Sequence, residues 1–134
     1  CSSDLARTRR ADRGVLVHGV QRVQGAVREG TSLPELELGG MALRHEAMAD
    51  EALPELSGHW HPRLRVNARG RMIARPCWVR SERKLVLPAF GSLTGGMDAG
   101  DPAIIAALQP AQVVDAVLSA RGQLIQYPLW RAAA

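Results

Sequence analysis

The sequence predicts a strand-rich globular domain with one short helix, and three observations lead to this prediction. Short apolar runs recur between glycine and proline residues, as is typical of buried strands. Polar and apolar residues alternate over 63–67, the pattern of a half-buried strand. The hydrophobic fraction of 46% and the charged fraction of 22% are those of an ordinary folded chain, which excludes general disorder, collagen and a disulfide scaffold.

The first half of the chain gives few strong signals. Residues 1–13 are polar without periodicity, and residues 20–32 are patterned only weakly, as a loop or a poor helix would be. Between them, the apolar run over 14–19 predicts a buried strand. Residues 36–45 predict two short strands around a turn at Gly39-Gly40. An acidic loop over 46–54 and a strand end at residue 56 follow.

The second half predicts antiparallel strands around one helix. A strand over 63–67, a turn at 68–70 and a second strand over 71–79 are expected, the second strand bent or at an edge because of Pro76. A turn at Arg83-Lys84 precedes a strand over 85–87, and a glycine-rich loop follows. Asp101-Pro102 combines an N-cap with proline at the first helical position, so a short helix begins there and ends before Pro110. A final hairpin joins 113–118 to 123–127.

Charge is distributed unevenly along the chain. Residues 1–28 carry a net charge of +4 (six Arg, two Asp) and residues 29–55 a net charge of −6 (one Arg, seven acids). Residues 63–84 carry a net charge of +7, from seven Arg and one Lys against Glu82. A basic stretch of this kind attracts phosphate or nucleic acid. The simpler alternative is a solvated strand face.

The two cysteines, Cys1 and Cys77, form no CxxC pair, which argues against a structural zinc site and favours a reducing, cytoplasmic compartment. No apolar run approaches the roughly 18–20 residues that span a bilayer, so no membrane association is predicted.

The most informative motif is Gly58 to Pro62, GHWHP. On extended backbone His59 and His61 point to the same side, and imidazole nitrogen is a good ligand for Zn, Mn, Fe or Ni. His45 and His18 lie at two other predicted strand ends, and strand ends of this kind line the rim of a sheet where ligands bind. The alternative is a β-rich domain whose histidines are solvated and free of metal.

Three stretches carry a resemblance to a known family: GHWHP at 58–62, RPCWV at 75–79 and LVLPAFGSLTGG at 85–96. They strongly resemble the ligase-associated DNA damage response endonucleases, which are bacterial calcineurin-like metallophosphoesterases. The resemblance runs from about Leu36 to Gly96 and more loosely to the last hairpin. The LVLPAFGSLTGG stretch is its most specific part, whereas GHxH occurs across the whole superfamily.

The resemblance implies the C-terminal part of a four-layer α/β sandwich, strand-rich and incomplete, with an exposed sheet edge and apolar face. It implies a hydrolase site with two divalent metal ions, Mn²⁺ above all, in which His45, His59 and His61 are ligands. It also implies DNA or another phosphodiester as substrate and DNA ligase or helicase as repair partners. From position and charge, and not from the family pattern, we predict that Arg63, Arg65 and Arg75 contact phosphate.

The chain departs from the family at its beginning. The family starts with Asp-x-His, Gly-Asp and Gly-Asn-His-Asp motifs, and this sequence contains no Asp-x-His. Val20 and Gln21 stand where the Asn ligand and the acid histidine are expected, so no catalytic acid is identified.

These departures divide the chain into a poorly matched segment, 1–32, and the C-terminal half of a metallophosphoesterase domain, 33–134. Without a bridging carboxylate three histidines are expected to hold at most one ion. We therefore expect a truncated chain that is inactive alone. The alternative is a non-catalytic remnant that binds nucleic acid or a protein partner through the basic segment 63–84.

Overall fold

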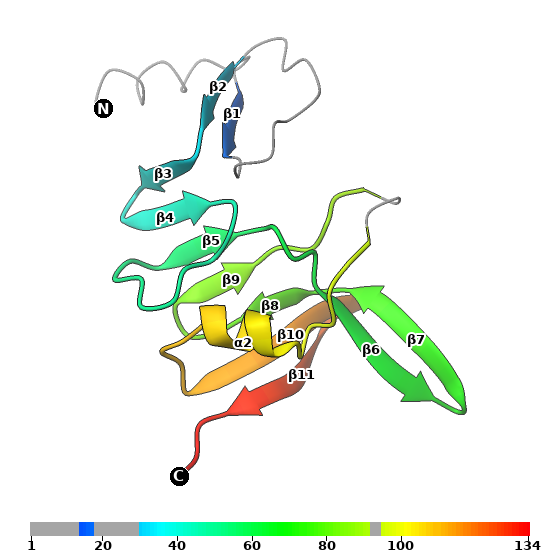
Figure 1. Ribbon diagram of the computed structural model, residues 1–134. Helices are drawn as coiled ribbons and strands as arrows, with labels where there is room; N and C mark the ends of the chain where they lie inside the picture. The colour runs from blue at the N-terminus through cyan, green and yellow to red at the C-terminus, as the bar shows by residue number, and fades with distance from the viewer. Residues whose placement is uncertain (1–13, 18–29, 92–94) are drawn as a thin grey trace.

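The computed structural model describes residues 14–17, 30–91 and 95–134 (Figure 1). Within these ranges the chain forms a mixed seven-stranded sheet, two separate two-stranded sheets and one short helix. The elements are β1 (Gly14–Val17), β2 (Gly30–Leu33), β3 (Glu35–Leu38), β4 (Met41–Arg44), β5 (Glu55–Ser57), β6 (Arg63–Ala68), β7 (Arg71–Pro76), β8 (Trp78–Arg80), β9 (Lys84–Val86), α2 (Pro102–Ala107), β10 (Val113–Ala120) and β11 (Gln123–Arg131). The strand-rich character predicted from the sequence is confirmed.

The large sheet has the strand order β11-β10-β8-β9-β5-β4-β3. Its centre is parallel, because β5 pairs in parallel with both β4 and β9. Antiparallel hairpins, β3–β4 and β10–β11, form its two edges. Both hairpins were predicted, and Gly39 and Gly40 adopt φ values of 60° and 74°, which the tight two-residue hairpin turn requires.

Three sequence predictions are wrong in detail. The single strand predicted over 71–79 is two strands in different sheets, because Pro76 has no N–H to continue the ladder and β8 begins only after Cys77. Lys84, predicted in a turn, begins β9. Residues 30–32, predicted as loop or poor helix, belong to β2, which pairs with β1 in parallel. Their Gly-Thr-Ser sequence gives no apolar strand signal.

One face of the large sheet is covered by α2, which lies against it in Figure 1. The carboxylate of Asp101 accepts a hydrogen bond from the Ala103 N–H at 2.8 Å, and Pro102 occupies the first turn, as predicted. Ile104 and Leu108 are fully buried against a core of small aliphatic side chains. No helix in the described ranges is long and apolar enough to cross a membrane.

The opposite face carries a row of leucines across four neighbouring strands. Leu36 pairs with Leu43, Leu43 with Leu56, and Leu56 with Leu85. Directly paired residues point to the same face of a sheet, so the four side chains form one apolar row, and each is only partly buried. This face of the sheet therefore presents a partly exposed apolar row.

The hairpin β6–β7 forms a sheet of its own and projects from the large sheet (Figure 1). The first half of β6 is tied to the rest of the chain, because Leu64 is buried in the hydrophobic core and Val66 packs against that core. There the Arg63 N–H donates to the Met97 carbonyl at 2.9 Å, and the Ala99 N–H donates to the Arg63 carbonyl at 3.0 Å.

Candidate functional site

The predicted histidines follow two neighbouring parallel strands. β4 ends at Arg44 immediately before His45, and β5 ends at Ser57 two residues before His59. Because parallel strands end at the same edge of a sheet, the two loops leave side by side. The Gly58 N–H donates to the His45 carbonyl at 2.9 Å and holds the loops together. The third histidine predicted at a strand end, His18, lies outside the described residues.

The imidazoles of His45 and His59 meet. The Nε2 atom of His45 lies 2.9 Å from Nδ1 of His59, and the ring centroids are 4.9 Å apart in an edge-on arrangement. Trp60 supports the His59 ring from another side, with 5.6 Å between ring centroids, and itself packs against the hydrophobic core. The sequence analysis expected the strand ends that carry His18, His45 and His59 to line one rim of a sheet, and the structure places His45 and His59 at the ends of neighbouring strands.

A carboxylate lies near the His59 ring, on the side away from His45. Oε2 of Glu46 is 3.9 Å from Nε2 of His59, the ring nitrogen that points away from His45. In metal sites a ligating histidine typically directs its second nitrogen to a carboxylate, which fixes the ring and raises its basicity. The sequence analysis missed Glu46, and the signal that could have found it is its position next to His45.

The GHWHP loop is held in an unusual backbone conformation. His59 and His61 have φ values of 64° and 48°, in the left-handed region that non-glycine residues rarely occupy. The loop is fixed by hydrogen bonds from the Trp60 N–H to the Gly58 carbonyl at 2.9 Å and from the Met97 N–H to the Trp60 carbonyl at 3.1 Å. Strained backbone of this kind clusters at functional sites, where the surroundings over-determine it.

His61 does not join the pair. Across the part of the chain that the structure describes, no three His, Cys, Asp or Glu side chains gather closely enough to hold a metal ion. The 2.9 Å between the ring nitrogens of His45 and His59 is a hydrogen-bond distance, in which one ring donates and the other accepts. The two imidazoles are nevertheless the ones that the fold brings together at this edge of the sheet.

The three predicted phosphate contacts do not lie together. Arg63 and Arg65 share one face of β6–β7, next to the histidine loop, and Nε of Arg63 is buried without a hydrogen-bond partner. Nη2 of Arg65 donates to the Gly96 carbonyl at 3.4 Å. Arg75 pairs with Leu64 and therefore lies on the other face. Alternation along the strand separates these arginines. Gln21, which stands where the family's acid histidine is expected, lies outside the described residues.

The three cations of the basic segment 63–84 that follow β7 also have structural partners. Nζ of Lys84, a buried side chain, donates to the carbonyls of Met48, Ala107 (2.8 Å) and Gln109 (3.0 Å), and burial lowers the pKa of its ammonium group. Arg83 donates to the Ala52 carbonyl, and Arg80 lies 3.9 Å from the buried carboxylate of Asp115. Five of the segment's seven arginines lie in residues 63–76, and the other two, Arg80 and Arg83, are exposed but have acceptors outside the hairpin.

No family model matches the chain, and no curated protein matches it significantly. Among solved structures, the chain is similar to Pseudomonas putida nuclease MPE, with 29% sequence identity and a TM-score of 0.49. The match covers 75% of this chain and 43% of the nuclease, so this chain spans less than half the length of the protein that it matches.

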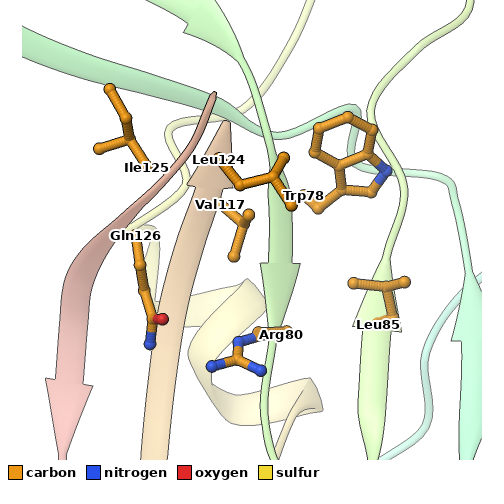
Figure 2. Close-up of a pocket in the computed structure, with 7 residues that line it drawn as sticks. All are labelled: Trp78, Arg80, Leu85, Val117, Leu124, Ile125 and Gln126. Atoms are coloured by element: carbon orange, nitrogen blue, oxygen red, sulfur yellow. The ribbon is translucent and has the colours of Figure 1, made fainter. Parts of the chain in front are cut away.

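A hollow of about 410 Å³ lies elsewhere, on the sheet face opposite α2 (Figure 2). Its lining residues come from β8, β9, β10 and β11 and are mostly apolar: Trp78, Arg80, Leu85, Val117, Leu124, Ile125 and Gln126. It contains none of the histidines, and it continues the row of partly buried leucines. Its single cation, Arg80, faces the Asp115 carboxylate, which is also 2.7 Å from Nη2 of Arg131.

Proposed function

We propose that this chain carries part of the site of a metal-dependent phosphodiesterase that cleaves nucleic acid, of the ligase-associated DNA-repair type. The observation that carries the proposal is the 2.9 Å approach of His45 and His59 at the ends of neighbouring parallel strands. The motifs around them support it by resemblance. In this proposal residues 33–134 are the C-terminal half of a calcineurin-like four-layer α/β sandwich.

His45 and His59 would hold a divalent ion, with Mn²⁺ proposed from the resemblance, and His61 is proposed as a further ligand from the same loop. A bound ion would lower the pKa of a coordinated water and polarise a phosphoryl oxygen. Glu46 would orient the His59 ring. Arg65, half-exposed beside this loop, would bind and orient a phosphate of the substrate.

Hydrolysis by this chain alone is expected to be weak or absent. Neutral imidazoles add no negative charge to a metal site, and paired ions generally require a bridging carboxylate. The sequence holds no Asp-x-His motif to provide it. The residues that would complete a two-metal site are not found in this sequence, and DNA ligase or helicase partners are proposed by resemblance only.

Metal binding and turnover must be measured separately to test this proposal. Titration calorimetry with Mn²⁺ should give about one equivalent bound. The His45→Ala and His59→Ala variants should bind at least about tenfold more weakly, because each removes a ligand. Glu37→Gln, an exposed acid on β3, serves as the control and should bind like the parent chain. Equal affinity in all four proteins would overturn the assignment.

Hydrolysis of single-stranded DNA and a model phosphodiester then reports whether the chain acts alone.

A second function, binding of nucleic acid without hydrolysis, is favoured by one observation. β7 is exposed along its whole length and carries two arginines, Arg71 and Arg75, without an acidic residue. A chain with this role would bind DNA whether or not a metal ion is present.

A further inference from the structure

The projecting hairpin β6–β7, residues 63–76, is here named the arginine arm. It contains five arginines and no acidic residue, a net charge of +5 within 14 residues. These arginines are Arg63, Arg65, Arg69, Arg71 and Arg75. A carboxylate of another segment, on Asp98, is 4.0 Å from Nε of Arg65 at the base.

The outer part of the arm has no packing role that explains its charge. Every residue of β7 is exposed, and so are Arg69 and Gly70 at the tip. Met72 and Ile73, near the tip, are 69% and 37% exposed, which is costly for apolar side chains in water. By contrast Arg80, Arg83 and Lys84, which follow the arm, have acceptors in the body of the protein.

The arginines lie on both faces of the arm. Arg63 and Arg65 share one face of β6, and Leu64 and Val66 share the other. Leu64 pairs with Arg75, and Ala68 pairs with Arg71, so these two arginines project on the face opposite Arg65. Arg69 lies in the turn, with φ 52°. A flat anionic surface can contact only one face of a two-stranded ribbon, whereas a groove walled by phosphates contacts both.

We infer that the arginine arm enters the major groove of B-form DNA. That groove is about 12 Å wide and admits a two-stranded β-ribbon, and phosphates line both of its edges. Guanidinium groups on the two faces of the arm would each meet one backbone, with bidentate contacts that suit arginine. The apolar side chains near the tip would meet base edges and thymine methyl groups. The deep, narrow major groove of A-form RNA would not admit the arm.

This inference rests on the proposed function and deepens it, because it states which form of nucleic acid the arm binds and in which groove. The arm itself contains none of the proposed metal ligands. The two are connected in space, since the arm begins at Arg63, two residues after His61. DNA held by the arm would lie beside the histidine loop. Binding is nevertheless expected without metal, so its failure and the failure of metal-dependent hydrolysis can be told apart.

Fluorescence anisotropy with a B-form duplex, in EDTA and at several salt concentrations, tests the inference. The variant Arg69→Gln/Arg71→Gln/Arg75→Gln removes three charges from exposed positions of the arm. It should bind at least about tenfold more weakly, and the slope of log K against log salt should fall by about one per arginine removed. The control Arg80→Gln/Arg83→Gln/Arg121→Gln removes the same charge outside the arm and should change affinity less than about threefold. Equal weakening of the two variants would overturn the assignment to the arm.

Two further measurements test the groove itself. Arg65→Gln and Arg75→Gln alter opposite faces, and each should weaken duplex binding; an effect confined to one face would contradict insertion between two backbones. Duplex RNA, single-stranded DNA and vesicles rich in phosphatidylserine should all bind more weakly than the B-form duplex at equal salt. Equal or tighter binding of any of them would reject the major groove as the site.

Discussion

The carbonyl oxygen of His61 lies so close to Gly96 that a Cβ atom at residue 96 would be 2.3 Å from it. The same Cβ would lie 2.8 and 2.9 Å from the side-chain carbons Cγ and Cδ of Arg63. The GHWHP loop therefore rests directly on the end of the LTGG stretch. Glycine at residue 96 is required by this contact and not by a positive φ.

The first prediction follows from this contact. Gly96→Ala should displace the histidine loop, lower the free energy of unfolding by about 1–3 kcal/mol as overpacking does, and weaken Mn²⁺ binding about tenfold. Gly95→Ala is a matched control, because a Cβ at Gly95 would have nothing within 4 Å. Thermal unfolding and Mn²⁺ titration of both variants measure the difference. If Gly96→Ala behaves like Gly95→Ala, the contact does not position the loop.

Local signals predicted most of the elements. Gly39-Gly40 predicted a hairpin, Asp101-Pro102 predicted the start of α2, and turn residues near Gly122 predicted the last hairpin. These signals work because each turn or helix start depends only on residues close in sequence. Pro76 marks where 71–79 divides, but the sheet that the second part joins was not predictable in this way. It depends on β8 pairing with β10, about forty residues later, which no local pattern encodes.

The site was predictable to a similar degree. His45 and His59 follow adjacent strand ends, so sequence order alone brought them together. The proximity of Glu46 to His59 and the separation of Arg75 from Arg65 depend on loop conformation and strand register. Lys84 was counted as surface charge, yet long-range contacts bury it beneath three carbonyl groups.

The second prediction concerns this buried lysine. Lys84→Met keeps an unbranched side chain but leaves the carbonyls of Met48, Ala107 and Gln109 without their charged donor. Hydrogen bonds to charged groups contribute about 1.5–3 kcal/mol each, so the free energy of unfolding should fall by at least about 2 kcal/mol. The neighbouring Arg83→Met removes one exposed hydrogen bond and should cost less than about 1 kcal/mol. Urea unfolding measures both, and equal losses would contradict a structural role specific to Lys84.

The third prediction concerns Cys77. Its side chain is fully buried, and desolvation raises the pKa of its thiol from 9.0 to about 11. A shift of this size reduces the thiolate fraction about 100-fold at neutral pH. In a Cys1→Ser background Cys77 is the one remaining cysteine, and it should resist Ellman's reagent at pH 8 until guanidinium unfolds the chain. Rapid labelling of the folded protein would contradict this burial.

The pKa of the Cys77 thiol is higher in the folded chain than in the unfolded chain. The thiol's contribution to stability is therefore present below pH 9.0 and is lost as the pH rises toward 11.

The fourth prediction compares two glutamates that contact Arg44. Desolvation raises the pKa of the buried Glu55 above 4.5, whereas the hydrogen bond from the Leu53 N–H is the largest cause that lowers the pKa of Glu51. Side-chain carboxyl shifts followed by NMR should therefore titrate with midpoints on opposite sides of pH 4.5. The stability that Glu55 contributes is complete below pH 4.5 and is lost as the pH rises through its folded pKa.

For Glu51 the sign is reversed: its contribution is present above pH 4.5 and is lost as the pH falls through its lowered pKa. The free energy of unfolding should therefore decrease as the pH rises just above 4.5. Glu55→Gln should make this decrease smaller, whereas Glu51→Gln should not change it. Coincident midpoints for the two carboxyl groups would mean that Glu55 is solvated and not held in the buried site where the Met48 N–H donates to its carboxylate at 3.2 Å.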